Sequence, residues 1–87
     1  MRIDFRKLII TDNAGNQVAI SWLEPVSSIA GETEYNCQPF MVSGHLVDRI
    51  KVNTEEDIIS VRRCERPHIG WRDINGNSVV SEAQAKA

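Results

Sequence analysis

The chain has 87 residues, of which 41% are hydrophobic and 25% charged, with a formal net charge of −2 and a pI of about 5.6. This length leaves room for one domain with a small core. The composition is that of a folded globular protein and disfavours a disordered chain, and the negative net charge disfavours a generic nucleic-acid binder. We expect neither a secretory signal nor a membrane span, and therefore a cytoplasmic protein whose two cysteines, Cys37 and Cys64, are reduced and buried.

The first quarter of the sequence predicts a hairpin. Residues 2–11 predict a strand, but their apolar side chains change face near Arg6–Lys7, which indicates either a bulge there or a strand with both faces partly covered. Residues 12–16 are rich in Asn, Asp and Gly and predict the turn. Residues 17–24 alternate cleanly and predict the return strand, which Pro25 should end because proline cannot donate a ladder hydrogen bond.

The middle of the sequence predicts a second strand pair. Residues 26–33 have the composition of a loop, and residues 34–42 predict a third strand with a bulge at Pro39. Ser43–Gly44 predicts a two-residue turn into a fourth strand over 45–52. The side chains that we expect to face the core from this fourth strand are Leu46, Ile50 and Val52.

One segment is ambiguous between a helix and a strand. Thr54 and the acids after it are typical of a helix start, three arginines follow near the expected end, and Pro67 would stop the helix. We therefore predict a short helix over about 54–66. Because Ile and Val favour strands, the alternative is that residues 57–64 return along 45–52 as a hairpin.

The last part of the chain predicts a final hairpin. Residues 68–74 and 77–81 predict two strands joined by Asn75–Gly76, and residues 82–87 predict a frayed tail. The fold class that follows is α+β. Residues 1–81 would form a single domain with a bulged antiparallel sheet of five to six strands and the short helix on one face. An all-β, barrel-like sheet is the alternative.

The charges are segregated along the sequence. No Lys or Arg lies between Leu8 and Asp48, whereas basic residues prevail from Arg49 to Arg72. Whether these two sets also separate in space depends on the fold.

The strongest candidate site is an arginine cluster near a tryptophan. Guanidinium groups suit phosphate and carboxylate recognition, and an indole ring offers a stacking surface. The alternative interpretation is a solvated helix face, with Trp71 and Trp22 both in the core. The residues proposed for anion or partner contact are Arg62, Arg63, Arg66, Arg72 and Trp71.

Other chemistry has weaker support. Cys37, His45, Cys64 and His68 have the side chains of a zinc site but not its usual spacing. Cys64 and His68 could pair as nucleophile and base, but no oxyanion motif accompanies them. We therefore predict no catalytic residue, no metal and no cofactor.

These observations favour a small non-enzymatic interaction module that binds a protein, or a second copy of itself, through a sheet face or edge. The alternative is an anion-binding or nucleic-acid-binding accessory protein that uses the arginine cluster. A thiol enzyme at Cys64 is the third hypothesis.

Overall fold

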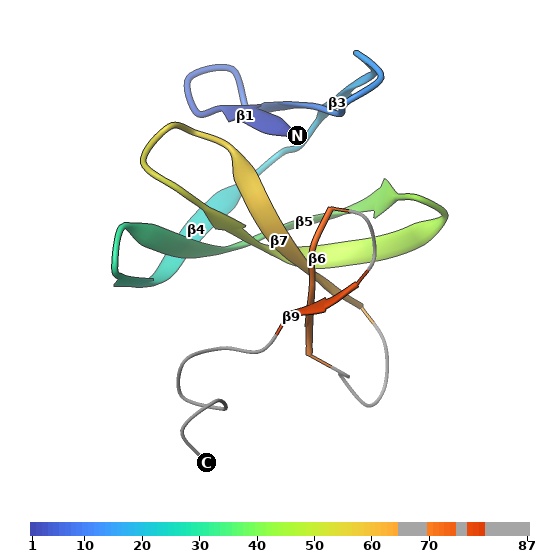
Figure 1. Cartoon of the computed structure of the whole chain (residues 1–87). Helices are drawn as coiled ribbons and strands as arrows, with labels where there is room; N and C mark the ends of the chain where they lie inside the picture. The colour runs from blue at the N-terminus through green and yellow to red at the C-terminus, as the bar shows by residue number, and fades with distance from the viewer. Residues whose placement is uncertain (65–69, 75–76, 80–87) are drawn as a thin grey trace.

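The computed structural model describes residues 1–64, 70–74 and 77–79, with only the backbone of Ser78 and Val79. In this part of the chain, nine strands form two antiparallel sheets (Figure 1). The small sheet has the order β1-β2-β3, and the large sheet has the order β4-β5-β6-β7-β8-β9. The strands are β1 (Arg2–Asp4), β2 (Ile9–Thr11), β3 (Gln17–Ala19), β4 (Leu23–Ile29), β5 (Glu32–Val42), β6 (His45–Val52), β7 (Ile58–Arg63), β8 (Trp71–Arg72) and β9 (Ser78–Val79).

The predicted α+β class is wrong, because the segment expected to be a helix is a turn followed by a strand. The side-chain oxygen of Asn53 accepts hydrogen bonds from the backbone N–H groups of Glu55 and Asp57, at 2.9 and 3.0 Å. Glu56 has a φ of 65°, outside the right-handed helical region. The chain then returns as β7 along β6, with Ile50 opposite Val61, as the alternative hairpin required.

The first predicted strand is in fact two strands. Asp4 pairs with Ile9 across a reversal of the chain, and Leu8 has a φ of 54°. The change of face near Arg6–Lys7 therefore marks a turn and not a bulge. The side chain of Asp4 accepts hydrogen bonds from the backbone N–H groups of Arg6 and Lys7 and holds this turn.

The strand expected over 17–24 is also divided, into β3 and the start of β4. Pro25 does not end β4: it pairs with Tyr35, and the ladder continues to Ile29. A proline is tolerated there because β4 is an edge strand of the large sheet. Most of the segment predicted to be a loop over 26–33 is thus strand. Its reversal is Ala30–Gly31, where both residues have positive φ, as a type I′ turn requires.

The β5–β6 hairpin confirms the predicted third and fourth strands and the Ser43–Gly44 turn between them. The predicted irregularity near Pro39 is also present. Three residues of β5 between Asn36 and Phe40 lie opposite one residue of β6. That residue of β6 is Asp48. The register of the β6–β7 pairing also shifts at this residue, between Val47 and Arg49.

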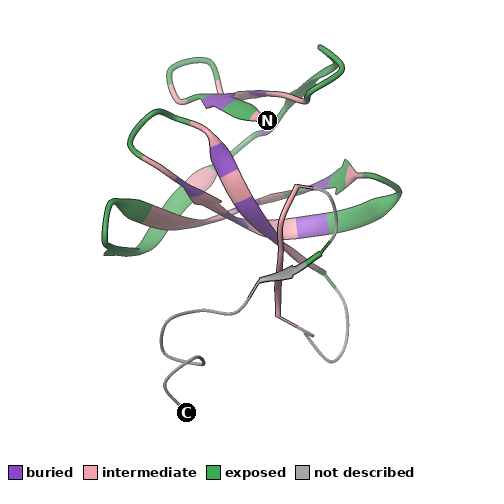
Figure 2. Cartoon of the chain, in the orientation of Figure 1, coloured by how far each residue is buried: buried purple, intermediate pink, exposed green. Residues whose placement is uncertain are grey.

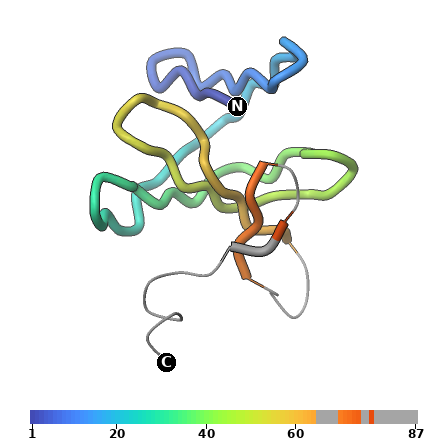
Figure 3. Tube along the Cα trace, viewed as in Figure 1, coloured from blue at the N-terminus to red at the C-terminus, as the bar shows by residue number. Residues whose placement is uncertain are grey.

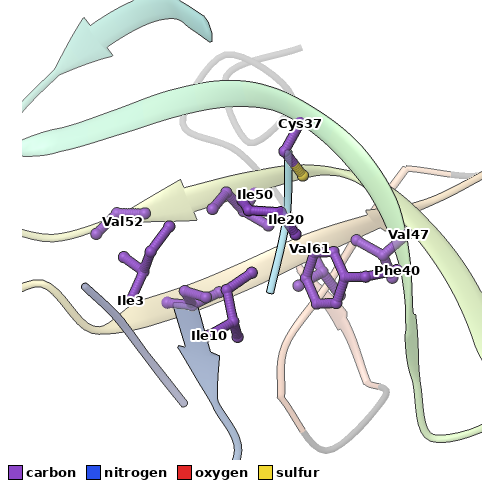
Figure 4. Packing of buried hydrophobic residues seen from close by; sticks show 10 residues of the cluster. Ile3, Ile10, Ile20, Cys37, Phe40, Val47, Ile50, Val52 and Val61 are labelled. Atoms are coloured by element: carbon purple, nitrogen blue, oxygen red, sulfur yellow. The ribbon is translucent and has the colours of Figure 1, made fainter. Parts of the chain in front are cut away.

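The core lies between the two sheets. Ile3 and Ile10 of the small sheet, with Ile20 just after it, point toward Ile50 and its neighbours on the large sheet (Figure 4). Buried residues accordingly lie along β6 and β7, up to the ends that meet at the β6–β7 loop, whereas β4 is exposed over nearly its whole length (Figure 2). The other members of the core are Cys37, Phe40, Val47, Val52, Ile58 and Val61.

Backbone hydrogen bonds also join the N-terminus to the start of β7. The N–H of Ile58 donates to the carbonyl oxygen of Met1 at 2.7 Å, and the N–H of Ile3 donates to that of Glu56 at 3.1 Å. The guanidinium of Arg2 forms an ion pair with Asp57 at 3.1 Å. The β6–β7 loop therefore lies directly beside the first strand (Figure 3).

The end of the described chain pairs β7 with β8 and β8 with β9. The predicted Asn75–Gly76 turn and the predicted tail over 82–87 lie outside the described residues. In the ranges that the structure covers, no helix has the length and hydrophobicity needed to cross a membrane.

Candidate interaction surface

The large sheet has one face on the core and one face turned away from β1–β3, which we call the outer face. Residues paired directly across strands share a face, and neighbours along a strand alternate between faces. Tyr35, Ile50 and Val61 pair across three strands and pack in or against the core. The next set of paired residues must therefore lie on the outer face. This first row is Glu24, Asn36, Arg49, Arg62 and Trp71.

A second row lies beside the first. Its members pair in the same way across β4, β5, β6 and β7, and one of them, Ser60, is buried although it is polar. The second row is Ser27, Glu34, Lys51 and Ser60. The two rows together give the outer face its charged centre.

The acidic and basic parts of the sequence meet on this face. Nη1 of Arg49 lies 3.0 Å from Oε2 of Glu34, and Nε of Arg49 donates to Oδ1 of Asn36 at 2.6 Å. The side chains of Glu34 and Arg49 are only 16% and 24% exposed, so water screens the pair incompletely. The junction between the two charge sets is therefore the β5–β6 boundary.

The basic side of the boundary contains an aromatic ring. The ammonium group of Lys51 lies 4.4 Å from the centroid of the Trp71 ring, within the range of a cation–π interaction. Arg62 lies directly between Arg49 and Trp71, and its Nε is buried without a hydrogen-bond partner among the described residues. A buried donor of this kind gains free energy from any acceptor that reaches it.

The charges on the two halves of the outer face balance. The β4–β5 half contains three carboxylates, and the β6–β7 half contains three cations. The acids are Glu24, Glu32 and Glu34, and the bases are Arg49, Lys51 and Arg62. The outer face is thus an acidic strip next to a basic strip.

Exposed apolar side chains lie on the same face. Met41 and Leu46 pair directly, and both are exposed, whereas Phe40 and Val47 beside them are buried in the core. Ile29 pairs with Glu32 at the other end of the sheet and is also exposed. Trp22, predicted to be in the core, is 46% exposed and precedes Leu23, which packs against the core.

The predicted arginine cluster is divided by the strand alternation. Arg62 and Trp71 are paired on the outer face. Arg63 pairs with Val47 and Arg72 pairs with Val61, which places both arginines on the opposite face of the sheet. Arg66 lies outside the described residues. The structure therefore brings together two of the five residues that the sequence singled out.

The residues that sequence reasoning missed are Glu34, Arg49 and Lys51. Each lies two residues from another outward-facing residue within a strand that was predicted, so alternation alone could have placed them on one face. Their pairing could not be derived in this way. The irregularity in β5 shifts the register, so that Glu34 lies opposite Lys51 and Asn36 opposite Arg49.

The predicted thiol and imidazole groups do not form a site in the part of the chain that is described. Cys37 is buried, Cys64 is exposed, and His68 lies outside the described residues. The expectation of two buried thiols is therefore wrong for Cys64. No group of three or more His, Cys, Asp or Glu side chains within these residues is arranged to hold a metal ion.

A pocket of about 240 Å³ lies between the small sheet and the β5–β6 hairpin. Its walls include Ile10, Val18 and Phe40, with Asp12 on the polar side. The carboxylate of Asp12 is occupied by its own turn: it accepts hydrogen bonds from Asn16 and Ala14, which lower its pKa. The pocket is smaller than the roughly 300–1,000 Å³ of ordinary small-molecule sites.

Comparison with known proteins yields no match: no family model, no curated protein and no solved structure is detectably similar to the chain. The function of the protein must therefore be inferred from its own surface.

Proposed function

We propose that the protein is an interaction module that binds a protein partner through the outer face of the large sheet. The observation that supports this proposal is the grouping of the exposed apolar side chains of Met41, Leu46 and Ile29 with charged side chains on this face. Apolar patches bordered by polar residues are typical of protein-binding surfaces. Such a module works by docking and contributes no reacting group of its own.

The face is a better candidate than the β4 edge of the sheet. The edge strand β4 contains Pro25, which has no N–H to offer to an added strand. Prolines and bulges on edge strands are common protections against strand addition. A register shift between Pro25 and Ser27 distorts the same edge.

The alternative, binding of anions or nucleic acid by the arginine cluster, has less support. Only Arg62 of the described arginines in that cluster lies on the outer face with Trp71, and Arg63 and Arg72 lie on the other side. The adjacent carboxylates of Glu24 and Glu34 would repel a phosphate backbone.

The test is capture of a partner by wild-type and variant proteins. We expect a protein that the wild type retains, whether another protein or a second copy of the chain, to be lost with the double variant Trp22→Ser, Ile29→Ser. The control is Val18→Ser, which changes an exposed valine on β3 of the small sheet and should retain the partner. Equal capture by all three proteins would contradict the proposal, as would the absence of any partner. A probe of single-stranded DNA at low salt tests the alternative.

A further inference from the structure

We propose that the partner of the outer face is a second copy of this chain, related to the first by a two-fold axis that runs parallel to the strands at the β5–β6 boundary. This inference rests on the proposed function, because it names the partner of the same face. It follows from the order of the charged strips and from the apolar pair at the hairpin end.

The two strips make the face complementary to itself. In a two-fold dimer, each contact between residue i and residue j occurs twice, so a face must contain both members of every pair. The outer face has three acids on β4–β5 and three bases on β6–β7. A partner that was only acidic or only basic would match one strip and be repelled by the other.

Only one orientation of the axis brings opposite charges together. An axis along the strands turns β4–β5 of one copy onto β6–β7 of the other, so that acid faces base. An axis across the strands would place each strip on its own equivalent, so that acid faces acid. The favourable axis also keeps the strands of the two sheets nearly aligned, which is a common arrangement of sheets packed about 10 Å apart.

The strand register determines which residues of the two copies face each other across this axis. Each residue of one copy faces the residue of the second copy that lies in the same row and equally far from the β5–β6 boundary, on its other side. Glu24 therefore faces Arg62 of the second copy, and Glu34 faces Lys51 of the second copy. Met41 faces Leu46 of the second copy, which buries two side chains that are exposed in one chain alone.

Charge reversal gives a test that a chance association would not pass. The variant Glu24→Arg places arginine against arginine in its own dimer, and Arg62→Glu places acid against acid, so each should dimerise at least about tenfold more weakly than the wild type. When the two variants are mixed, both contacts become acid against base. We expect them to form a heterodimer of near wild-type affinity. Sedimentation velocity or light scattering of each protein and of the mixture measures this.

Matched controls distinguish the effect of a charge change on the outer face from the effect of a change in net charge. Glu55→Arg and Arg6→Glu make the same charge changes at exposed positions away from the outer face, and both should dimerise like the wild type. Because Arg62 is half-buried, the variant Arg62→Glu could fail to fold. A second pair of variants therefore makes the test independent of that variant. Met41→Glu and Leu46→Lys alter exposed side chains and should likewise be weak alone and restored when mixed.

The outcomes distinguish this inference from the proposed function. A monomeric wild type at concentrations of about 100 μM, well above a micromolar Kd, would overturn the dimer. So would variants that dimerise normally, or mixtures that do not associate. If the wild type is monomeric but captures another protein that the Trp22→Ser, Ile29→Ser variant loses, the dimer is wrong and the interaction function stands. If the wild type neither dimerises nor captures a protein that this variant loses, both proposals are contradicted.

Discussion

The Glu34 carboxylate and the Arg49 guanidinium meet across β5 and β6 at 3.0 Å, and this contact joins the acidic and basic parts of the chain. Arg49 also donates to Asn36, so two hydrogen bonds hold its side chain against the sheet. Because Arg62 lies directly opposite Arg49 on β7, Glu34 also offsets the repulsion between the two guanidinium groups.

The first prediction concerns this pair. We expect Arg49→Ala to lower the free energy of unfolding by about 1–3 kcal/mol, because it leaves a largely buried carboxylate without its partner. A double-mutant cycle with Glu34→Gln, measured by urea denaturation, should give a coupling energy of at least about 0.5 kcal/mol. The cycle at Arg2 and Asp57, which also form an ion pair but are more exposed, should give less. Additive effects at Glu34 and Arg49 would show that the contact contributes nothing.

The second prediction compares the same substitution at a buried and an exposed valine. Val52 is 1% exposed and Val26 is 48% exposed. Val52→Ala removes two buried methyl groups and should destabilise the protein by about 2–3 kcal/mol, because the transfer and cavity contributions add. Val26→Ala should change stability by less than about 0.5 kcal/mol. Thermal denaturation of both variants checks this, and equal losses would contradict the assignment of the core.

The parts of the fold that sequence reasoning predicted are those set by local chemistry. The β5–β6 hairpin is the clearest case, because alternating strands flank a Ser43–Gly44 turn whose glycine supplies positive φ. Pro39 likewise marked the irregularity in β5. In both places one or two residues determine the local backbone, so pattern and structure agree.

The errors arise where local signals fit two structures or where the decisive contact is distant. Asn53 and the acids after it suit a helix start as well as the turn that they form, and only the pairing of β7 with β6 decides between them. Simple alternation with Ile50 predicts that Leu46 faces the core. The bulge at Asp48 reverses the face, so Val47 is buried instead. The outer-face site depends on the same register shifts and was therefore only partly predictable.

The third prediction concerns the turn between β4 and β5. Ala30 has a φ of 53°, a left-handed conformation that disfavours alanine but suits asparagine, and Gly31 follows it. Ala30→Asn creates the preferred Asn-Gly turn and should raise the free energy of unfolding by about 0.5–1 kcal/mol. Ala14→Asn is the control, since Ala14 is a loop alanine without positive φ. A loss of stability in Ala30→Asn would mean that the turn differs from the one described.

The fourth prediction concerns the two thiols. Burial, together with the smaller effect of the negative charge of Asp48, raises the pKa of the Cys37 thiol to about 12, whereas Cys64 is exposed. The thiolate is the reactive form, so iodoacetamide at pH 8 should modify the native protein once, at Cys64. The variant Cys64→Ser should remain unmodified until denaturant is added. Intact-mass measurement distinguishes these states, and rapid labelling of native Cys64→Ser would show that Cys37 is accessible.

The fifth prediction follows from the same pKa. The unfolded Cys37 thiol loses its proton near its ordinary value of 9.0, whereas the folded thiol keeps its proton to about pH 12. Above pH 9 the unfolded state therefore binds fewer protons than the folded state, and stability must fall as the pH rises. The contribution of the protonated Cys37 thiol to the free energy of unfolding is complete below pH 9. Above pH 9 it decreases by up to about 1.4 kcal/mol per pH unit. The measurement is the difference between the wild type and Cys37→Ala in urea denaturation from pH 8 to pH 10.5, because this difference isolates the effect of the Cys37 thiol. The wild type should lose stability more steeply than the variant, and parallel curves would mean that the Cys37 thiol titrates alike in the folded and unfolded chains.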